Sequence, residues 1–252
     1  MGREFALRKH DDALTFGFQL AYYFGIPNKG TVYQLQTNLA SIAYEQLLHK
    51  IVTFKLVPGT TLQERQLAEQ LQMSRTPVRE ALNRLTHEGW VQSSLKRNMM
   101  EVKPVTREDV NELFGMRELF EMHGTERIFE EKANTPIGAK LQGLADDVRN
   151  FPLVAADEMA LMTADIRFHT QLMYFKDASR LSRFWEQISL EFIRLGITAL
   201  RSRNGGRSKV GDEHDAIVES ILRRRKKQTR ETIRYHNEQT KLHIFKSLDG
   251  LL

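Results

Sequence analysis

Residues 62–103 read LQERQLAEQLQMSRTPVREALNRLTHEGWVQSSLKRNMMEVK, and this stretch decides the fold of the first part of the chain. Leu67 and Leu71 recur at the spacing of a helix, and Thr61 with Glu64 predicts a capping box at its start. A tight turn, a second helix and a ribbon of two strands are expected to follow. This order of elements predicts a helix-turn-helix with a β-wing.

The second helix of this stretch carries the candidate reading head. Ser74 is a favourable N-cap, and Gly89 ends the helix. Arg75 and Arg79 lie four residues apart and share one face, with Thr76 beside them. The opposite, apolar face consists of Val78, Ala81, Leu82 and Leu85. Donors at the N-terminal end of such a helix are the groups that read base edges in the major groove.

A helix with several arginines is more often an ordinary solvated surface, so the arginines alone do not establish DNA binding. The order of the parts favours DNA binding. A helix and a tight turn precede a helix that opens with Ser-Arg-Thr-Pro, and glycine and a basic ribbon come after it.

Residues 56–91, LVPGTTLQERQLAEQLQMSRTPVREALNRLTHEGWV, resemble the winged-helix domain of GntR-family transcription regulators. The matching positions include Pro58-Gly59, Leu67-Ala68, residues 74–82 and Glu88-Gly89. The resemblance implies contacts to DNA from the helix before the recognition helix, from the recognition helix itself and from the wing. The residues are Arg65, Ser74, Arg75, Thr76, Arg79, Lys96 and Arg97. The wing of the family usually turns on glycine, whereas this chain has Leu95-Lys96-Arg97-Asn98.

The composition is that of a globular protein with room for two domains. The chain has 252 residues, of which 41% are hydrophobic and 27% charged. Its net charge of +5 favours a polyanionic partner. The absence of cysteine excludes disulfides and thiolate chemistry and agrees with a cytoplasmic location. No apolar run approaches the roughly 20 residues that span a bilayer, so no membrane association is expected.

Three regions are expected along the chain. Residues 1–36 form an extension of unknown role; Ala13–Ile26 is apolar, and a secretory signal is the alternative, although no small-residue cleavage site follows. Residues 37–103 form the winged helix-turn-helix, whose first helix lies within Thr37–Phe54. Residues 104–252 form a second domain.

The second domain has a helical pattern throughout. Thr106 with Asp109 predicts a capping-type start for its first helix, which runs to about Lys132. Five further helical segments follow; four lie within residues 135–150, 156–175, 179–203 and about 208–222, and the last runs to about Leu248. The predicted fold is therefore mainly α, with an all-α bundle of six or seven helices after the winged domain.

A second group of residues points to a metal site. Asp165 and His169 lie four residues apart on one helix face, and they offer a carboxylate and an imidazole to one centre. His214 and His236 lie on two later helices that can pair in antiparallel fashion and bring both rings to one side. For any single histidine, an ordinary hydrogen-bonded role is the more frequent outcome.

The helical half resembles the FCD domain, the ligand-sensing bundle of FadR-type GntR regulators. The resemblance implies that Asp165, His169, His214 and His236 bind a divalent metal ion, zinc or nickel. It also implies that Arg117 faces the cavity, where a guanidinium suits an organic acid effector. The alternative for Arg117 is a surface pair with Glu121 at i+4. The basic run 223–227 is interpreted as a solvated connection between helices.

These patterns predict a transcription regulator, not an enzyme. We expect a homodimeric repressor that binds a palindromic double-stranded operator and responds to a small organic acid. A regulator for which the metal ion itself is the signal is the alternative. A metal-dependent hydrolase is a further one, since an Asp-His-His-His site with open positions can activate water.

Overall fold

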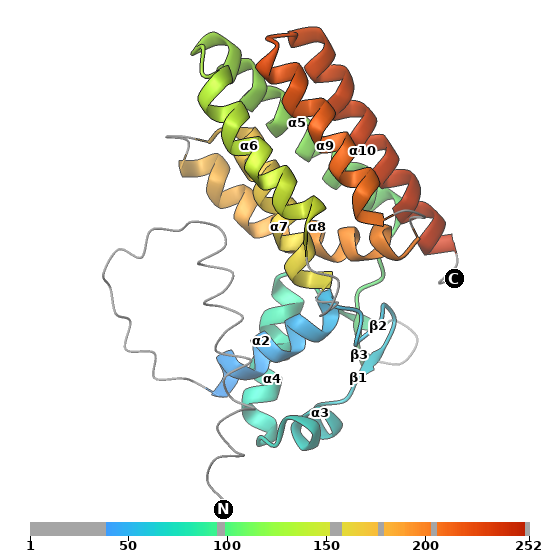
Figure 1. Cartoon of the computed structure of the whole chain (residues 1–252). Helices are drawn as coiled ribbons and strands as arrows, with labels where there is room; N and C mark the ends of the chain where they lie inside the picture. Colours follow the sequence, from blue (N-terminus) through green and yellow to red (C-terminus); the bar gives the residue numbers. More distant parts are fainter. Residues whose placement is uncertain (1–38, 95–98, 152–157, 176–178, 203–205, 250–252) are drawn as a thin grey trace, which may run out of the picture. The chain divides into compact units, whose positions relative to one another are not determined.

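The computed structural model describes residues 39–94, 99–151, 158–175, 179–202 and 206–249. Within these ranges lie nine helices and one small sheet, so the prediction of a mainly helical chain is confirmed (Figure 1). The chain divides into two compact units, with the boundary between Val105 and Thr106. The predicted extension 1–36 lies outside the described residues. No helix in the described ranges is long and apolar enough to cross a membrane.

The first unit is a helix-turn-helix with an antiparallel sheet. In chain order its elements are α2 (Leu39–Val52), β1 (Thr61–Leu62), α3 (Glu64–Leu71), α4 (Arg75–His87), β2 (Val91–Ser94) and β3 (Met99–Val102). Its core is formed mainly where α2 packs against α4, from Ala43, Leu47, Ile51, Val78, Leu82 and Leu85. The apolar stripe predicted for the recognition helix is therefore the face that this unit buries.

The sheet has one more strand than the sequence predicted. Its order is β1-β3-β2, and Thr61 of β1 is the partner of Glu101 on β3. The capping box predicted between Thr61 and Glu64 is wrong, because Thr61 belongs to this strand and Gln63 is the N-cap of α3. A strand of two residues has too little pattern to be recognised before its partner is known.

The turn between α3 and α4 has the geometry that a tight helix-turn-helix needs. Gln72 ends α3 in the left-handed region at φ 55°. Ser74 is extended and is the N-cap of α4, as predicted. At the other end, Gly89 takes φ +81°, a conformation that glycine adopts without steric cost, and the chain turns there into β2.

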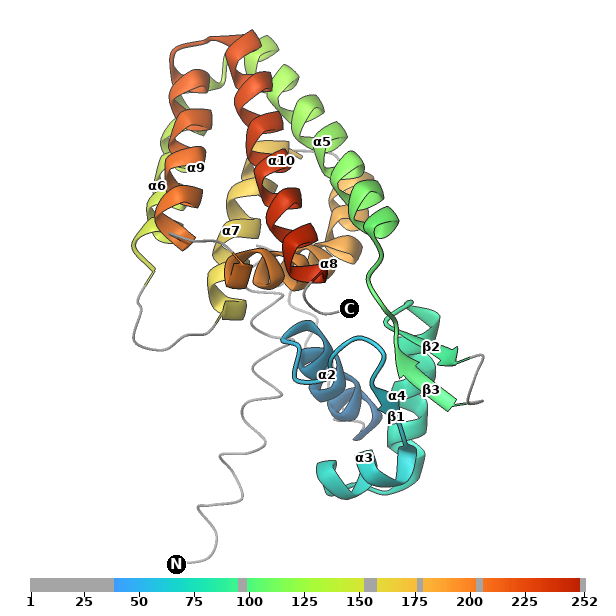
Figure 2. The same cartoon turned by 90° about the vertical axis from the view of Figure 1, so that its right-hand side faces the viewer.

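The second unit is the helical bundle (Figure 2). Its described helices are α5 (Arg107–Glu130), α6 (Asn134–Arg149), α7 (Glu158–Met173), α8 (Ser179–Ser202), α9 (Gly206–Leu222) and α10 (Lys226–Asp249). The helix α5 begins with the predicted capping box, in which the Thr106 hydroxyl accepts from the Asp109 amide and the Asp109 carboxylate accepts from the Thr106 amide. The basic run 223–227 is exposed; its three arginines connect α9 to α10, whereas Lys226 and Lys227 begin α10, so it is a solvated connection only in its first part.

The bundle core joins α5, α6, α7, α9 and α10. Its buried side chains include Ile128, Leu141, Phe168, Leu172, Ile217, Ile221 and Ile233. The helix α5 comes very close to α7 at Gly124, where an added Cβ would lie 2.3 Å from the backbone of Met173. Only glycine allows the two helices to come this close.

Candidate functional site

The predicted DNA-contacting residues of α3 and α4 lie on the surface of the first unit. The side chains of Arg65 and Arg75 are 82% and 70% exposed. Ser74, Thr76 and Arg79 are also exposed, on the first turn of α4 or directly before it. The structure therefore exposes all five residues, with Arg65 on α3 and the other four at the N-terminal end of the recognition helix. The predicted wing residues, Lys96 and Arg97, lie outside the described residues.

The ion pairs on this surface are weak ones. Arg65 Nε lies 3.1 Å from Glu69 Oε1 on the same helix. Arg75 Nη2 lies 3.4 Å from Glu64 Oε2, which links α4 to α3. Exposed pairs of this kind contribute about 0–1 kcal/mol. Exchange of such a carboxylate for a DNA phosphate therefore costs little.

A half-buried cluster fixes the C-terminal end of α4 to α2. The hydroxyl of Tyr44 donates to Glu88 Oε2 at 2.5 Å, and the Arg84 guanidinium lies 3.6 Å from the centre of the Tyr44 ring. Burial and the bond to Glu88 raise the pKa of Tyr44, so the phenol remains protonated. Sequence reasoning did not identify this cluster, because its members lie far apart in the chain.

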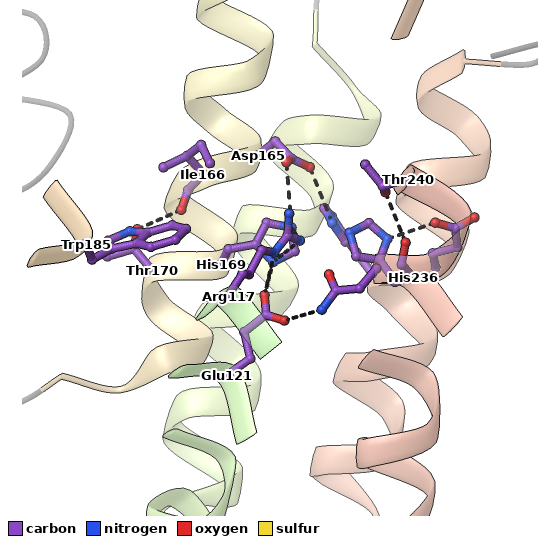
Figure 3. Close-up of polar contacts among 12 residues, drawn as sticks. Arg117, Glu121, Asp165, Ile166, His169, Thr170, Trp185, His236 and Thr240 are labelled. Atoms are coloured by element: carbon purple, nitrogen blue, oxygen red, sulfur yellow. Dashed lines mark hydrogen bonds and ion pairs between the residues drawn. The ribbon is translucent and has the colours of Figure 1, made fainter. Parts of the chain in front are cut away.

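The three predicted histidine ligands meet inside the bundle. His169 on α7, His214 on α9 and His236 on α10 are all buried. Each offers a ring nitrogen, and these three nitrogens lie within 4.8 Å of one another. The ring centroids are 4.9 to 5.1 Å apart. The sequence placed these residues on three helices, and the fold brings them to one centre; Figure 3 shows two of them, His169 and His236, with Asp165 above.

The fourth predicted ligand, Asp165, lies beside two of these rings. Its Oδ2 is 3.6 Å from Nε2 of His169, and its Oδ1 is 3.4 Å from Nε2 of His214. The side chain is 15% exposed, more than any of the three histidines. Phe168 stacks on the His214 ring at 3.9 Å and restricts its rotation.

Arg117 is buried, with 3% of its surface exposed, so the alternative of a surface pair is wrong in its location. It does pair with Glu121, from Nε to Oε1 at 3.0 Å, but within the bundle. Its Nη2 also lies 2.6 Å from Nε2 of His169. Both residues of α5 thus point toward the histidine cluster (Figure 3).

The charge state of His169 suits metal binding. Complete burial, the nearby Arg117 guanidinium and His236 lower the pKa of His169 well below its ordinary value. A lowered pKa keeps the imidazole neutral, and the neutral ring is the form that donates a lone pair to a metal. The contact with Glu121 is therefore a hydrogen bond from a neutral ring, not an ion pair.

Carboxylates lie behind two of the three rings. Nδ1 of His169 lies 2.7 Å from Glu121 Oε1, and Nδ1 of His236 lies 2.8 Å from Glu213 Oε2. Ligating histidines commonly donate their second nitrogen to a carboxylate in this way. Three imidazoles with one adjacent carboxylate fit a divalent ion such as zinc or nickel without selecting between them.

Sequence reasoning did not assign a role at this centre to Glu121, Glu213 or Asn237. A signal was present for two of them. Glu121 follows Arg117 by one helical turn, and Glu213 directly precedes His214. Asn237 directly follows His236, but nothing in the sequence indicated its contact with α5, where its amide donates to Glu121 Oε2 at 2.9 Å.

Comparison with family profiles gives two matches that follow one another along the chain. Residues 39–98 match the profile described as bacterial regulatory proteins, gntR family. Residues 112–239 match the FCD domain. The first match covers the helix-turn-helix with strands β1 and β2, and the second covers the histidine cluster.

Several known proteins are similar over most of the chain. An uncharacterized HTH-type transcriptional regulator, YdhC of Bacillus subtilis, is 24% identical over 215 residues, which are 83% of this chain and 89% of that protein. The gluconate operon transcriptional repressor of Bacillus subtilis is 26% identical over 185 residues, 71% of this chain and 74% of the repressor.

Solved structures share the fold at low identity. A putative GntR transcriptional regulator from Rhodococcus sp. RHA1 is 20% identical with a TM-score of 0.61, over 82% of this chain and 97% of that one. McbR/YncC of E. coli is 21% identical with a TM-score of 0.59, over the same shares of the two chains.

Proposed function

Because the chain belongs to the GntR family of transcription regulators and carries an FCD domain after the winged helix, we propose that it is a ligand-responsive repressor. It binds a palindromic operator as a homodimer, and a small carboxylate in the helical domain controls that binding. Residues 37–103 are its DNA-binding domain and residues 104–252 its effector domain. A similar protein, the gluconate operon regulator of Bacillus subtilis, is named a repressor.

The observation that carries the proposal is the asymmetry of α4. Its apolar side, with Val78 and Leu82, is buried, while Arg75, Thr76 and Arg79 are exposed near its N-terminus. Entry of this end into a major groove brings arginine donors to guanine edges and threonine to a phosphate or a base. Lys96 and Arg97 of the wing add contacts in the adjacent groove or to the backbone.

Exposed apolar side chains on α5 and α8 support a dimer. Leu119 is 70% exposed and Phe184 is 42% exposed. Phe120 packs edge-on against both Phe184 and Phe175, with ring centroids 6.0 Å apart in each pair. Large apolar groups gathered on a surface mark an interaction site. A second copy of the chain is the occupant that a palindromic operator requires.

The effector site lies at Arg117 and the histidine cluster. Asp165, His169, His214 and His236 hold a divalent ion, which supplies open coordination positions for a carboxylate oxygen. Arg117 donates to the second oxygen of the same carboxylate, because a guanidinium matches that geometry. The effector must bind the two arrangements of the dimer unequally for operator affinity to change.

The direct test starts from operator DNA selected by the purified protein from random duplexes. We expect an inverted repeat with half-sites about one helical turn apart. Titration of metal-loaded protein with a series of small organic acids is then expected to change operator affinity for one chemical class. Selection of a site without two-fold symmetry contradicts the dimer, and an affinity that no acid changes contradicts the effector.

A metal sensor is the second candidate, and the buried histidine cluster favours it. In that case the ion alone changes operator affinity. Removal of the ion with a chelator, in the absence of any organic acid, distinguishes the two candidates. A large change in operator affinity on chelation supports the sensor, whereas a change that requires the acid supports the effector.

A further inference from the structure

The carboxylate of Glu121, on α5, contacts side chains of three helices of the bundle, α5, α7 and α10. Its Oε1 lies 3.0 Å from Arg117 Nε on the same helix and 2.7 Å from His169 Nδ1 on α7. Its Oε2 accepts from Asn237 Nδ2 on α10 at 2.9 Å. Glu121 itself is fully buried. Both oxygens therefore have donors in a place where an unpaired charge would be costly.

This arrangement fixes the tautomer of His169. An ionised carboxylate only accepts hydrogen bonds, so the proton of the neutral ring must be on Nδ1. The lone pair is then on Nε2, the nitrogen nearer to Asp165 at 3.6 Å. The ring thus directs this lone pair to the side on which Asp165 lies, where Arg117 Nη2 also approaches Nε2 to 2.6 Å.

Glu121 also balances the charge of Arg117. A buried guanidinium next to a divalent ion repels that ion strongly, since the interior screens charge poorly. The 3.0 Å pair with Glu121 offsets the positive charge before an ion binds. Glu121 is therefore suited both to orient a ligand and to reduce repulsion at the same centre.

Asn237 holds Glu121 in this orientation. Its Nδ2 donates to the carboxylate, whereas its Oδ1 is buried without a hydrogen-bond partner among the described residues. A buried amide that leaves its oxygen unsatisfied carries a cost in stability. The bond to Glu121 is thus the polar contact that accounts for its position.

From these contacts we propose that Glu121 is a positioning residue of the metal centre, which aims Nε2 of His169 at the ion and neutralises Arg117 beside it. Glu121 does not touch the ion. The inference rests on the proposed metal site and adds a residue that controls its affinity. Glu213 makes a comparable bond to His236, at 2.8 Å.

The test is Glu121→Gln in the full chain. Dissociation constants for Zn²⁺ and Co²⁺ are measured by competition with a chromophoric chelator, and the visible absorption spectrum of the Co²⁺ form is recorded. We expect about 10- to 100-fold weaker binding of both ions, the usual effect of losing such an outer partner. The Co²⁺ bands shift because a different tautomer or ring orientation is presented. A purely structural role would lower the melting temperature without moving these bands.

The matched control is Glu118→Gln on the same helix. Glu118 pairs with Arg234 at 2.8 Å on the surface, and its loss is expected to leave ion affinity and spectrum unchanged. Should Glu121→Gln fail to fold, Asn237→Ala removes a donor to the carboxylate without touching His169, and a smaller loss of affinity is expected. If the variant that folds binds both ions with unchanged affinity, the role of Glu121 is overturned while the metal site itself stands. No stoichiometric binding of either ion by the unaltered protein overturns the metal site and the inference together.

Discussion

The two units place their arginines in opposite surroundings. On the winged unit, Arg65 and Arg75 are 82% and 70% exposed, and each has one surface ion pair. In the bundle, Arg117 is 3% exposed and contacts both Glu121 and His169. The exposed groups come from one contiguous stretch of sequence. The buried groups come from α5, α7, α9 and α10.

This difference predicts how each site responds to substitution. A side chain on the exposed surface contributes one separable contact, so its removal should cost a fixed amount of binding and little stability. A side chain in the buried cluster shares partners with its neighbours, and its removal should disturb several at once. The tests below run from the largest expected effect to the smallest.

Loss of the cluster should remove the metal altogether. The double substitution of His169→Ala and His214→Ala deletes two of the three converging imidazoles, and we expect bound metal to fall from stoichiometric to background. Elemental analysis of the purified protein measures it. His123→Ala, on an exposed position of α5, is the control and should retain full metal content. Metal content that survives the double substitution contradicts the assigned ligands.

Single substitutions on the exposed surface should have graded effects. Arg75→Ala or Arg79→Ala is expected to weaken specific operator binding by about 1–3 kcal/mol with the fold intact. Quantitative operator binding at fixed salt, with circular dichroism, measures both quantities. Arg223→Ala removes an exposed arginine from the bundle and should leave operator affinity unchanged. If Arg223→Ala and Arg75→Ala reduce operator affinity equally, net charge and not the recognition helix determines binding.

The buried cluster should also give the bundle a pH dependence. The pKa of His169 is lowered in the folded state, so below its ordinary pKa of 6.5 the unfolded chain binds a proton that the folded chain does not. Protonation of His169 therefore does not reduce the free energy of unfolding of the metal-free bundle above that pH. Below it, this free energy falls as the pH drops, by at most about 1.4 kcal/mol per pH unit for one group.

Thermal unfolding in the presence of a chelator, at several pH values between 7 and 5, measures this effect. His169→Asn removes the titrating group and should flatten the slope, whereas His123→Ala should not. A slope that is identical in the unaltered protein and in His169→Asn would assign the pH dependence to other groups.

The smallest effect is expected from loss of the half-buried hydrogen bond between Tyr44 and Glu88 in the winged unit. Tyr44→Phe deletes the hydroxyl that donates to Glu88, and we expect a loss of about 1 kcal/mol in the unfolding free energy of that unit. Chemical denaturation followed for the winged unit measures it. Tyr235→Phe, at an exposed position of α10, should change nothing. A Tyr44 variant as stable as the unaltered protein would show that the bond to Glu88 adds nothing to the apolar packing of α4 on α2.

Features of the sequence that depend on near neighbours were predictable. The capping box of Thr106 and Asp109, the N-cap Ser74 and the turn at Gly89 all involve residues within a few positions of each other. The capping box of Thr61 was wrong because the strand partner of Thr61, Glu101, is forty residues away. The spacing of neighbouring residues cannot show that Thr61 pairs with a distant strand instead of capping a helix.

The buried site was predictable in part for the same reason. The pair Asp165 and His169 follows from helical spacing, whereas the convergence of His214 and His236 on it depends on how three helices pack. Helical spacing relates Arg117 to Glu121 equally well on a surface and in a core, so only burial separates the two interpretations. The donor from Asn237 is a tertiary contact without a local pattern.

Gly124 lies one helical turn after Glu121, at the point where α5 nearly touches the backbone of Met173. A single added methyl group at this position would act as a wedge between α5 and α7. Glu121 lies on α5 and His169 on α7. The added methyl group would therefore increase the distance between the carboxylate and the ring without altering either residue. Loss of signal response in a variant of this protein need not map to any side chain that binds the ion, the acid or the operator.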